Sequence, residues 1–222
     1  MEYKFYYPDG KKCESIEKFL EFYSKAYYIQ NNVYVEDCVL KIADEELQKL
    51  SKKDIFLILA WKLGKINYLT TTEKKVNYYK GWDEKKLCAQ IRKNKSIDIS
   101  EVYRKISEIT DKKSLEEYLR KLEEIDGLGN TTVIALAFFA SNRQVMLYDR
   151  FAARAVAAID GDVKPFNNIP VKIPDISYIS IERCKEIHKA YTNKVNTIFG
   201  EFNNDRRIDQ ALWVYGHMFK KP

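Results

Sequence analysis

The amino-acid sequence predicts an all-α protein that folds as a single globular unit over residues 1–222, built from two helical lobes. Apolar residues recur at helical spacing through most of the chain, and alternating apolar and polar residues are scarce. The stretch 1–10 favours an extended chain, and its tripeptide Pro-Asp-Gly predicts a turn. Prolines gather in the segment 163–177, which has no helical period and indicates a long loop crossing the surface or joining the lobes.

The helices are predicted in order from the spacing of apolar residues. The run 15–29 places apolar side chains on one face, and 52–66 is apolar enough for a central helix. The cleanest pattern covers 114–125, where Ser114 and Glu117 predict a capping box. The same reasoning predicts further helices over 35–50, 83–95, 100–109, 131–141, 149–159, 180–199 and 204–219.

The composition indicates a soluble cytoplasmic protein without a metal or other cofactor. The longest apolar run, VIALAFFA, has eight residues, whereas a membrane span needs about twenty. The N-terminus is polar and lacks a signal-peptide core. A net charge of +6 permits nucleic-acid binding without requiring it. The cysteines lie too far apart for zinc or iron–sulfur ligation and are expected to be reduced, partly buried thiols: Cys13, Cys38, Cys88 and Cys184.

The stretch LEEIDGLGNTTVIALAFFAS (122–141) predicts two helices joined by a turn that contains Gly127 and Gly129. Asn130 is a suitable N-cap for the second helix. Backbone N–H groups near a helix N-terminus can bind an anion, and glycine lets a phosphate come close. The alternative is a simple turn between helices.

Asp149, in VMLYDRFAARAVAAI, stands eighteen residues beyond Thr131 and begins an alanine-rich helix. With this spacing the chain resembles the helix–hairpin–helix superfamily of DNA glycosylases over about residues 114–158. In that family a hairpin of the form L-P-G-h-G-x-x-T-A is followed by h-x-V-D-x-x-h-x-R. The closing run 206–219 also looks like the last helix of bacterial proteins with the oxidised-guanine glycosylase fold. The matching positions are Leu122, Ile125, Gly127, Leu128, Gly129, Thr132, Asp149 and Arg154.

The chain departs from the family pattern at several positions. Thr131 stands where bifunctional members carry a lysine, and threonine cannot form the Schiff base that drives strand cleavage. Asp126 replaces the hairpin proline, Tyr148 and Arg150 replace the residues on either side of the aspartate, and the cysteines of the iron–sulfur cluster are missing. The chain therefore resembles the monofunctional branch.

The resemblance implies a fold with a cleft between two helical lobes and a base-excision DNA glycosylase, a hydrolase of DNA repair. The expected partner is duplex DNA with a damaged or modified base that is flipped into the cleft, bound by a monomer. Asp149 would be the catalytic carboxylate, although an aspartate at a helix start is also a common N-cap. The implied DNA-binding residues are Gly127, Leu128, Gly129, Asn130, Thr131 and Arg150.

Side chains outside the hairpin are open to two interpretations. The segment 73–95 carries eight basic and three acidic residues, with Tyr78, Tyr79 and Trp82 among them. Such a pattern can bind a phosphate backbone and stack a base, or it can be a solvated lysine-rich surface. Arg150 and Arg154 could contact phosphates or form surface or structural ion pairs, and the structural role is preferred for the second arginine. Trp61 and Trp213 fit core positions.

Two other functions remain open. A non-catalytic DNA-binding or defence-associated protein could retain the glycosylase fold, and the missing hairpin lysine favours this alternative. A protein-interaction scaffold fits if other chain segments bury the hairpin turn.

Overall fold

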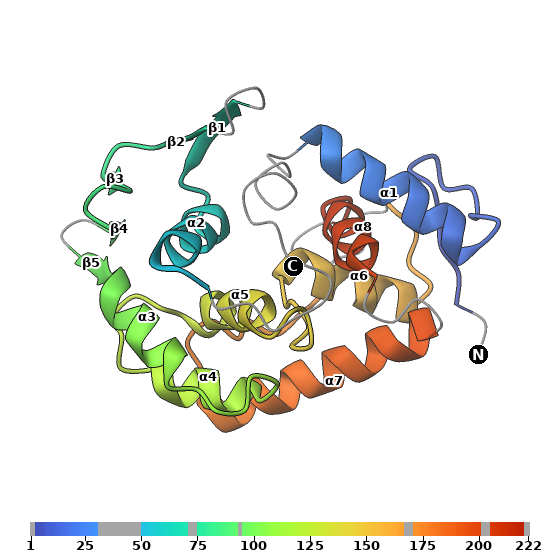
Figure 1. Cartoon of the computed structure of the whole chain (residues 1–222). Coiled ribbons are helices and arrows are strands. Elements are labelled where there is room, and N and C mark those ends of the chain that lie inside the picture. Colours follow the sequence, from blue (N-terminus) through green and yellow to red (C-terminus); the bar gives the residue numbers. More distant parts are fainter. Residues whose placement is uncertain are drawn as a thin grey trace. The chain divides into compact units, whose positions relative to one another are not determined.

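A computed structural model describes residues 3–30, 50–70, 75–92, 95–166, 171–200 and 205–219 (Figure 1). This part of the chain is mostly helical, with eight helices and two small antiparallel sheets. The predicted predominance of helix is therefore confirmed, whereas the sheets depart from an all-α fold. The chain divides into two compact units, here called the terminal unit and the central unit.

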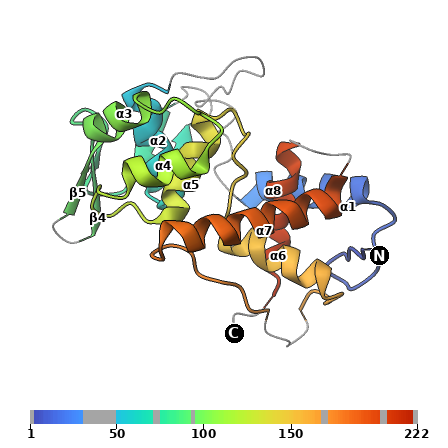
Figure 2. The ribbon, with the colours of Figure 1, turned by 90° about the horizontal axis from the view of Figure 1, so that it is seen from below.

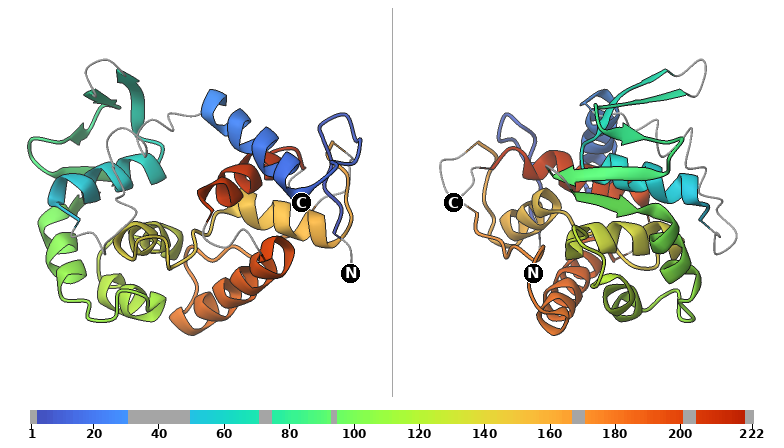
Figure 3. Two further views of the ribbon diagram at one scale, coloured as in Figure 1. Left: turned by 45° about the vertical axis from the view of Figure 1, so that its right-hand side comes forward. Right: turned by 90° about the vertical axis from the view of Figure 1, so that its left-hand side faces the viewer.

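The terminal unit combines residues 1–31, 148–175 and 186–222. Helix α8 packs against α1 on one side and against α6 on the other (Figure 1; Figure 3). Aromatic rings fill the space between these helices, because large rings bury much apolar area at tilted and edge-on contacts. The elements are α1 (Ile16–Gln30), α6 (Arg150–Asp160), most of α7 (Ile181–Phe199) and α8 (Arg206–Gly216), and the core rings include Phe5, Phe19, Tyr23, Phe199 and Tyr215.

The predicted turn near the N-terminus is confirmed. The N–H of Gly10 donates to the carbonyl of Tyr7 at 2.9 Å, and Gly10 has a φ of +81°, which favours glycine. Tyr6 pairs with Lys12 across the turn. Tyr23 of α1 donates its hydroxyl hydrogen to the carbonyl of Tyr6 at 2.7 Å, so the turn is fixed to the helical core.

The central unit contains residues 32–147 and 176–185. Its core is formed by α2 and α5, which are buried over 55–60 and 132–140 respectively. A helix that is apolar all round must be covered on every side, and α2 and α4 both pack against α5. The helices are α2 (Lys52–Lys62), α3 (Ile99–Ser107), α4 (Leu115–Leu122) and α5 (Asn130–Ala140).

Five short strands of the central unit form the two sheets. β1 pairs with β2, and β4 lies between β3 and β5, all antiparallel. Figure 2 shows the β4–β5 hairpin beside α3. The strands are β1 (Ile66–Thr70), β2 (Lys75–Tyr78), β3 (Trp82–Asp83), β4 (Cys88–Arg92) and β5 (Lys95–Asp98).

The predicted helix over 83–95 is wrong. Ala89 of β4 pairs with Ile97 of β5, and both side chains are fully buried. Burial of this pair outweighs the helix propensity of the neighbouring charged residues, which is a weak preference. The helix predicted over 52–66 also ends early, because Gly64 adopts a φ of +63° after α2. The helix predicted over 35–50 falls almost entirely outside the described residues.

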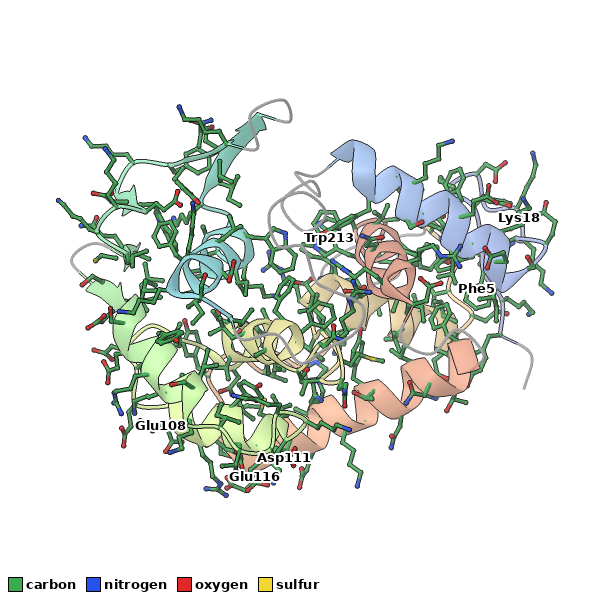
Figure 4. All side chains as sticks on the ribbon, in the orientation of Figure 1. Phe5, Lys18, Glu108, Asp111, Glu116 and Trp213 are labelled. Atoms are coloured by element: carbon green, nitrogen blue, oxygen red, sulfur yellow. The ribbon has the colours of Figure 1, made fainter. Side chains whose placement is uncertain are left out.

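The other predicted helices are present, with one change at the start of α4. Ser114 caps α4 by accepting the N–H of Glu117 at 3.4 Å. The Glu117 carboxylate does not complete the predicted capping box. It instead accepts the N–H groups of Thr110 and Asp111 in the preceding loop, at 3.0 and 3.2 Å. Asp111, labelled in Figure 4, belongs to the chain segment that joins α3 to α4.

Three described cysteines are free thiols. Burial raises the pKa of the Cys13 thiol to about 12 and that of Cys184 to about 11, so both are protonated at neutral pH. Among the described residues, no set of three or more histidine, cysteine or acidic side chains could hold a metal ion. Within the same ranges, no helix combines the length and the apolar character needed to cross a membrane.

Candidate functional site

The two hairpin glycines are required by packing inside the central unit. Gly127 has a φ of +90°, and a Cβ there would overlap the Cδ1 atom of Ile91. Gly129 is buried, and a Cβ there would lie 2.9 Å from the carbonyl oxygen of Ser177 and 3.3 Å from the ring of Tyr178. Other chain segments therefore approach both positions too closely for a residue with a Cβ, which explains why Gly127 and Gly129 are glycines.

Asn130 is the first residue of α5, and Gly129 is its N-cap, so the predicted N-cap is displaced by one residue. The side-chain amide of Asn130 donates to the carbonyls of Ile176 and Ile179, at 2.8 and 3.0 Å. Its backbone N–H donates to the carbonyl of Ser177 at 2.9 Å. A side chain turned toward this loop cannot also cap its helix. These bonds hold the loop against the hairpin turn.

The surface of the hairpin turn carries an exposed aromatic ring. Tyr178 is 74% exposed and lies against Gly129. Leu128 is buried and Thr131 is half-buried on the first turn of α5. Tyr178 could not be predicted from the sequence, because a single aromatic residue in a loop has no periodic pattern.

The basic segment 73–95 contains one exposed aromatic side chain in its described part. Tyr78 and Trp82 both pack on Phe56, at ring distances of 5.1 and 5.4 Å; Trp82 belongs to the core, and Tyr78 is half-buried beside it. Tyr79 is 50% exposed. Four lysines close to Tyr79 in the sequence are also exposed: Lys75, Lys80, Lys85 and Lys86.

Asp149 lies in the terminal unit as the N-cap of α6, as an aspartate at a helix start predicts. Its backbone is extended, with φ −132° and ψ 146°. Its Oδ1 accepts the N–H of Phe151 at 2.8 Å. The residue is half-buried, and a negative charge is favoured at a helix N-terminus. One carboxylate oxygen is thus held in a fixed direction.

Helices α6 and α8 meet by direct backbone contact. Gly216 ends α8, and a Cβ there would overlap the carbonyl oxygen of Phe151. This approach lets the ring of His217 stack on Phe151, with centroids 3.4 Å apart and planes 18° from parallel. Trp213, labelled on α8 in Figure 4, lies 3.9 Å from the His217 ring. It is half-buried in this stack, although its sequence pattern fits a core residue.

The stacked imidazole has a defined tautomer. Nδ1 of His217 lies 2.7 Å from the carbonyl oxygen of Trp213. A carbonyl only accepts, so Nδ1 carries the hydrogen and Nε2 of the neutral ring keeps a lone pair. The rings stacked on it partly desolvate the His217 imidazole and lower its pKa, although the residue keeps an exposed edge; the Trp213 carbonyl and Asp149 oppose this shift, and two nearby arginines add to it. His217 is therefore neutral at pH 7.

The two arginines at the start of α6 have different surroundings. Arg154 is 4% exposed, and its guanidinium lies 3.5 Å from the carbonyl of Gly216. Burial lowers the pKa of Arg154, and the charge of Arg150 lowers it further. Arg154 therefore has a structural role, as preferred from the sequence. Arg150 is exposed, with its guanidinium 4.8 Å from the Phe151 ring centre.

Tyr191 of α7 completes this group of side chains. Its ring packs on Tyr148, the residue before Asp149, at 5.0 Å. Burial raises the pKa of Tyr191 well above 10, and the carboxylates of Asp209 and Asp149 raise it further. The phenol is therefore neutral at pH 7.

The sequence-predicted residues fall into two groups. Asp149 and Arg150 belong to the terminal unit, together with the three side chains that the sequence did not assign to a site, His217, Trp213 and Tyr191. The predicted DNA-binding residues 127–131 belong to the central unit. Comparisons with protein-family models, curated proteins and solved structures found no match.

The stacked histidine predicts a pH-dependent stability. The pKa of His217 in the folded chain lies below its ordinary value of 6.5, so the unfolded chain takes up a proton first as the pH falls. The stabilising contribution is complete above pH 6.5 and decreases as the pH falls through that value. We expect the free energy of unfolding, measured with denaturant from about pH 7.5 to 5.5, to decrease more steeply for the parent than for His217→Gln. If the free energy of unfolding had the same pH dependence in the parent and in His217→Gln, the lowered pKa of His217 would be contradicted.

Proposed function

We propose that the protein binds duplex DNA and hydrolyses the N-glycosidic bond of a damaged or modified base. The observation that supports this function best is the Asp149 carboxylate, fixed by the Phe151 N–H at 2.8 Å and half-buried beside ionisable and aromatic side chains. Side chains with perturbed pKa values gather at functional sites, and here they include His217 and Tyr191. The spacing from the hairpin supports the same role.

The chemistry needs a carboxylate in a fixed position. Breaking the bond between sugar and base builds positive charge on the sugar, and a pre-oriented negative group stabilises that charge. The Phe151 N–H in the first turn of α6 orients the Asp149 carboxylate. Nε2 of neutral His217 can accept a hydrogen bond, and the adjoining aromatic rings offer apolar surface to a base.

The proposed phosphate contacts lie on the hairpin backbone from Gly127 to Thr131 and on Arg150. Asn130 has its N–H and its amide bonded to the loop around Ser177. Its contribution in this proposal is to keep the turn rigid. Because Ile91, Ser177 and Tyr178 occupy the space beside the two glycines, the proposed phosphate contacts from Gly127 to Gly129 are made by backbone groups of the turn and not by close approach over the glycine Cα atoms. Tyr178 extends the same surface with an exposed ring.

Thr131 predicts that the reaction stops at an abasic site. In a panel of lesion-bearing duplexes, we expect release of a free base and strand breakage only after alkali or heat. Borohydride should trap no protein–DNA adduct, because trapping needs an imine formed by an amine nucleophile. A trapped adduct from the parent protein would exclude the monofunctional mechanism. Absence of base release from every duplex would exclude the glycosylase.

A second candidate is a non-catalytic DNA-binding or defence-associated protein that keeps the glycosylase fold. The threonine at position 131 favours it, and salt-sensitive duplex binding without base release on the same panel would support it. The interaction-scaffold alternative needs a covered hairpin turn. Ser177 and Tyr178 do approach Gly129 closely, so failure to bind any duplex would favour the scaffold.

A further inference from the structure

Tyr178 is an exposed aromatic residue on a loop whose backbone is fixed. It is 74% exposed, the largest fraction among the exposed aromatic residues that the structure describes. A single exposed aromatic residue is ordinary by itself, but the loop that carries Tyr178 is bonded to Asn130 at three points. The amide of Asn130 donates to the carbonyls of Ile176 and Ile179, at 2.8 and 3.0 Å. Its backbone N–H donates to the carbonyl of Ser177 at 2.9 Å.

These bonds hold the backbone of Tyr178 in a defined position. The bonded carbonyls lie on both sides of Tyr178 in the sequence, and the side chain of Ile176 is fully buried. Surface loops are usually mobile, and the entropy lost when a mobile loop is ordered lowers the affinity for a partner. An aromatic ring on a loop that is already fixed avoids much of this loss. The loop is therefore suited to present Tyr178 to a binding partner.

The ring of Tyr178 covers one side of the hairpin turn. A Cβ on Gly129 would lie 3.3 Å from Cε1 and 3.4 Å from Cζ of Tyr178, so this edge of the ring faces Gly129. Gly129 is the N-cap of α5, and both residues belong to the central unit. Cζ carries the hydroxyl group, which therefore lies close to the N-terminal end of α5. Because Gly129 is buried and Tyr178 is exposed, a molecule that reaches this side of the turn contacts Tyr178 first.

We propose that Tyr178 contacts bound DNA, with its ring packed on a deoxyribose and its hydroxyl donating to a neighbouring phosphate oxygen. This inference rests on the proposed binding of duplex DNA at the hairpin turn. A phenol combines an apolar ring with a polar tip, which matches a sugar beside a phosphate. The chain has a net charge of +6, which favours a polyanion as the partner.

The sugar and the phosphate are the groups that a fixed side chain reaches on an intact duplex. Such contacts set the position of a protein on DNA without reading its sequence. Insertion of the ring between base pairs would instead require the bases to unstack. The contact is therefore expected to be the same on duplexes of different sequence, with or without a lesion.

Tyr178→Ala and Tyr178→Phe test the two parts of this contact. The probe is a fluorescein-labelled, lesion-free duplex of mixed sequence, and the affinity is measured by fluorescence anisotropy. We expect Tyr178→Ala to weaken binding by about 10-fold, because part of the ring returns to water. Tyr178→Phe keeps the ring and should weaken binding by about 3-fold, the effect of one lost hydrogen bond.

Phe166→Ala is the matched control for the loss of an exposed ring. Phe166 is 64% exposed and belongs to the terminal unit, whereas the hairpin turn belongs to the central unit. Phe166→Ala should bind the duplex like the parent, and an equal loss of affinity in this variant would overturn the inference. Tyr178→Ala should melt like the parent, because Asn130 bonds to backbone carbonyls that the substitution leaves in place.

The salt dependence of binding separates this contact from one made by a charged group. The logarithm of the affinity falls with the logarithm of the salt concentration, with a slope set by the number of phosphates that the protein neutralises. Tyr178→Ala removes no charge, so it should lower the affinity at every salt concentration without changing this slope. Arg150→Ala removes a proposed phosphate contact and should reduce the slope by about 1. A reduced slope in Tyr178→Ala would overturn the inference.

The remaining outcomes separate this inference from the proposed function. Salt-sensitive duplex binding that is unchanged in Tyr178→Ala would overturn the inference and leave the proposed function in place. A much larger loss of affinity on a mismatched duplex than on the matched one would indicate insertion between bases and would overturn the sugar contact. A parent protein that binds no duplex would refute the proposed function, and the inference with it.

Discussion

Replacing Asp149 by asparagine is expected to lower base excision by about 10²–10³-fold, the effect of removing one group that stabilises developing charge. The amide has nearly the same size as the carboxylate but carries no negative charge. It can neither balance the positive charge on the sugar nor accept a proton from the attacking water. The rate should be measured under single-turnover conditions on a duplex that the parent cleaves.

The same substitution should leave the fold and the DNA affinity in place. Asparagine caps helices about as well as aspartate, so the N–H of Phe151 keeps its acceptor. The free energy of unfolding should therefore change by less than about 1 kcal/mol. Affinity for the duplex, measured by fluorescence anisotropy, should stay equal or increase, because one negative charge near the phosphates is lost.

Asp98→Asn is the matched control for Asp149→Asn. Asp98 is the N-cap of α3 in the central unit and accepts the N–H of Ser100 at 2.8 Å. It shares the residue type and the cap geometry of Asp149 but belongs to the other unit. Excision by Asp98→Asn should equal that of the parent. Equal rates for the parent and Asp149→Asn would remove the carboxylate from the mechanism.

Most helices could be predicted because each is defined by residues close together in the sequence. In α3, the residues Ile99, Val102 and Ile106 are buried and lie on one helical face. The N-cap of α6 could be predicted for the same reason, because an aspartate before an alanine-rich run is a local signal.

The strands and most of the candidate site depend on contacts between distant residues. The charged sequence around β4 favours helix locally, yet Ala89 is buried by pairing with β5. Single-sequence periodicity does not report such pairing. The position of His217 likewise depends on Phe151, which lies far away in the sequence on α6. Asp149 could be chosen from a pattern, whereas its neighbours Tyr191 and His217 could not.

Gly216→Ala is expected to destabilise the terminal unit by about 3 kcal/mol or more. The new methyl group would overlap the backbone carbonyl oxygen of Phe151, and a backbone atom cannot move aside as a flexible side chain can. Helix propensity predicts the opposite sign, because alanine is favoured over glycine by about 1 kcal/mol in a helix interior. The overlap outweighs this gain. The melting temperature should fall by roughly 6–12 °C.

The loss of stability in Gly216→Ala should come from the contact between α6 and α8. Gly200→Ala is the control that tests this origin. Gly200 follows α7 in the same unit, and a Cβ there would meet no atom within 4 Å. Gly200→Ala should therefore unfold like the parent in a thermal melt followed by circular dichroism. In the folded fraction of Gly216→Ala, the His217 ring protons should lose the shielding caused by the stacked Phe151 ring. If Gly216→Ala were as stable as the parent and kept this shielding, the helices would not meet by backbone contact. The position of His217 beside Asp149 would then have to arise from ring stacking alone.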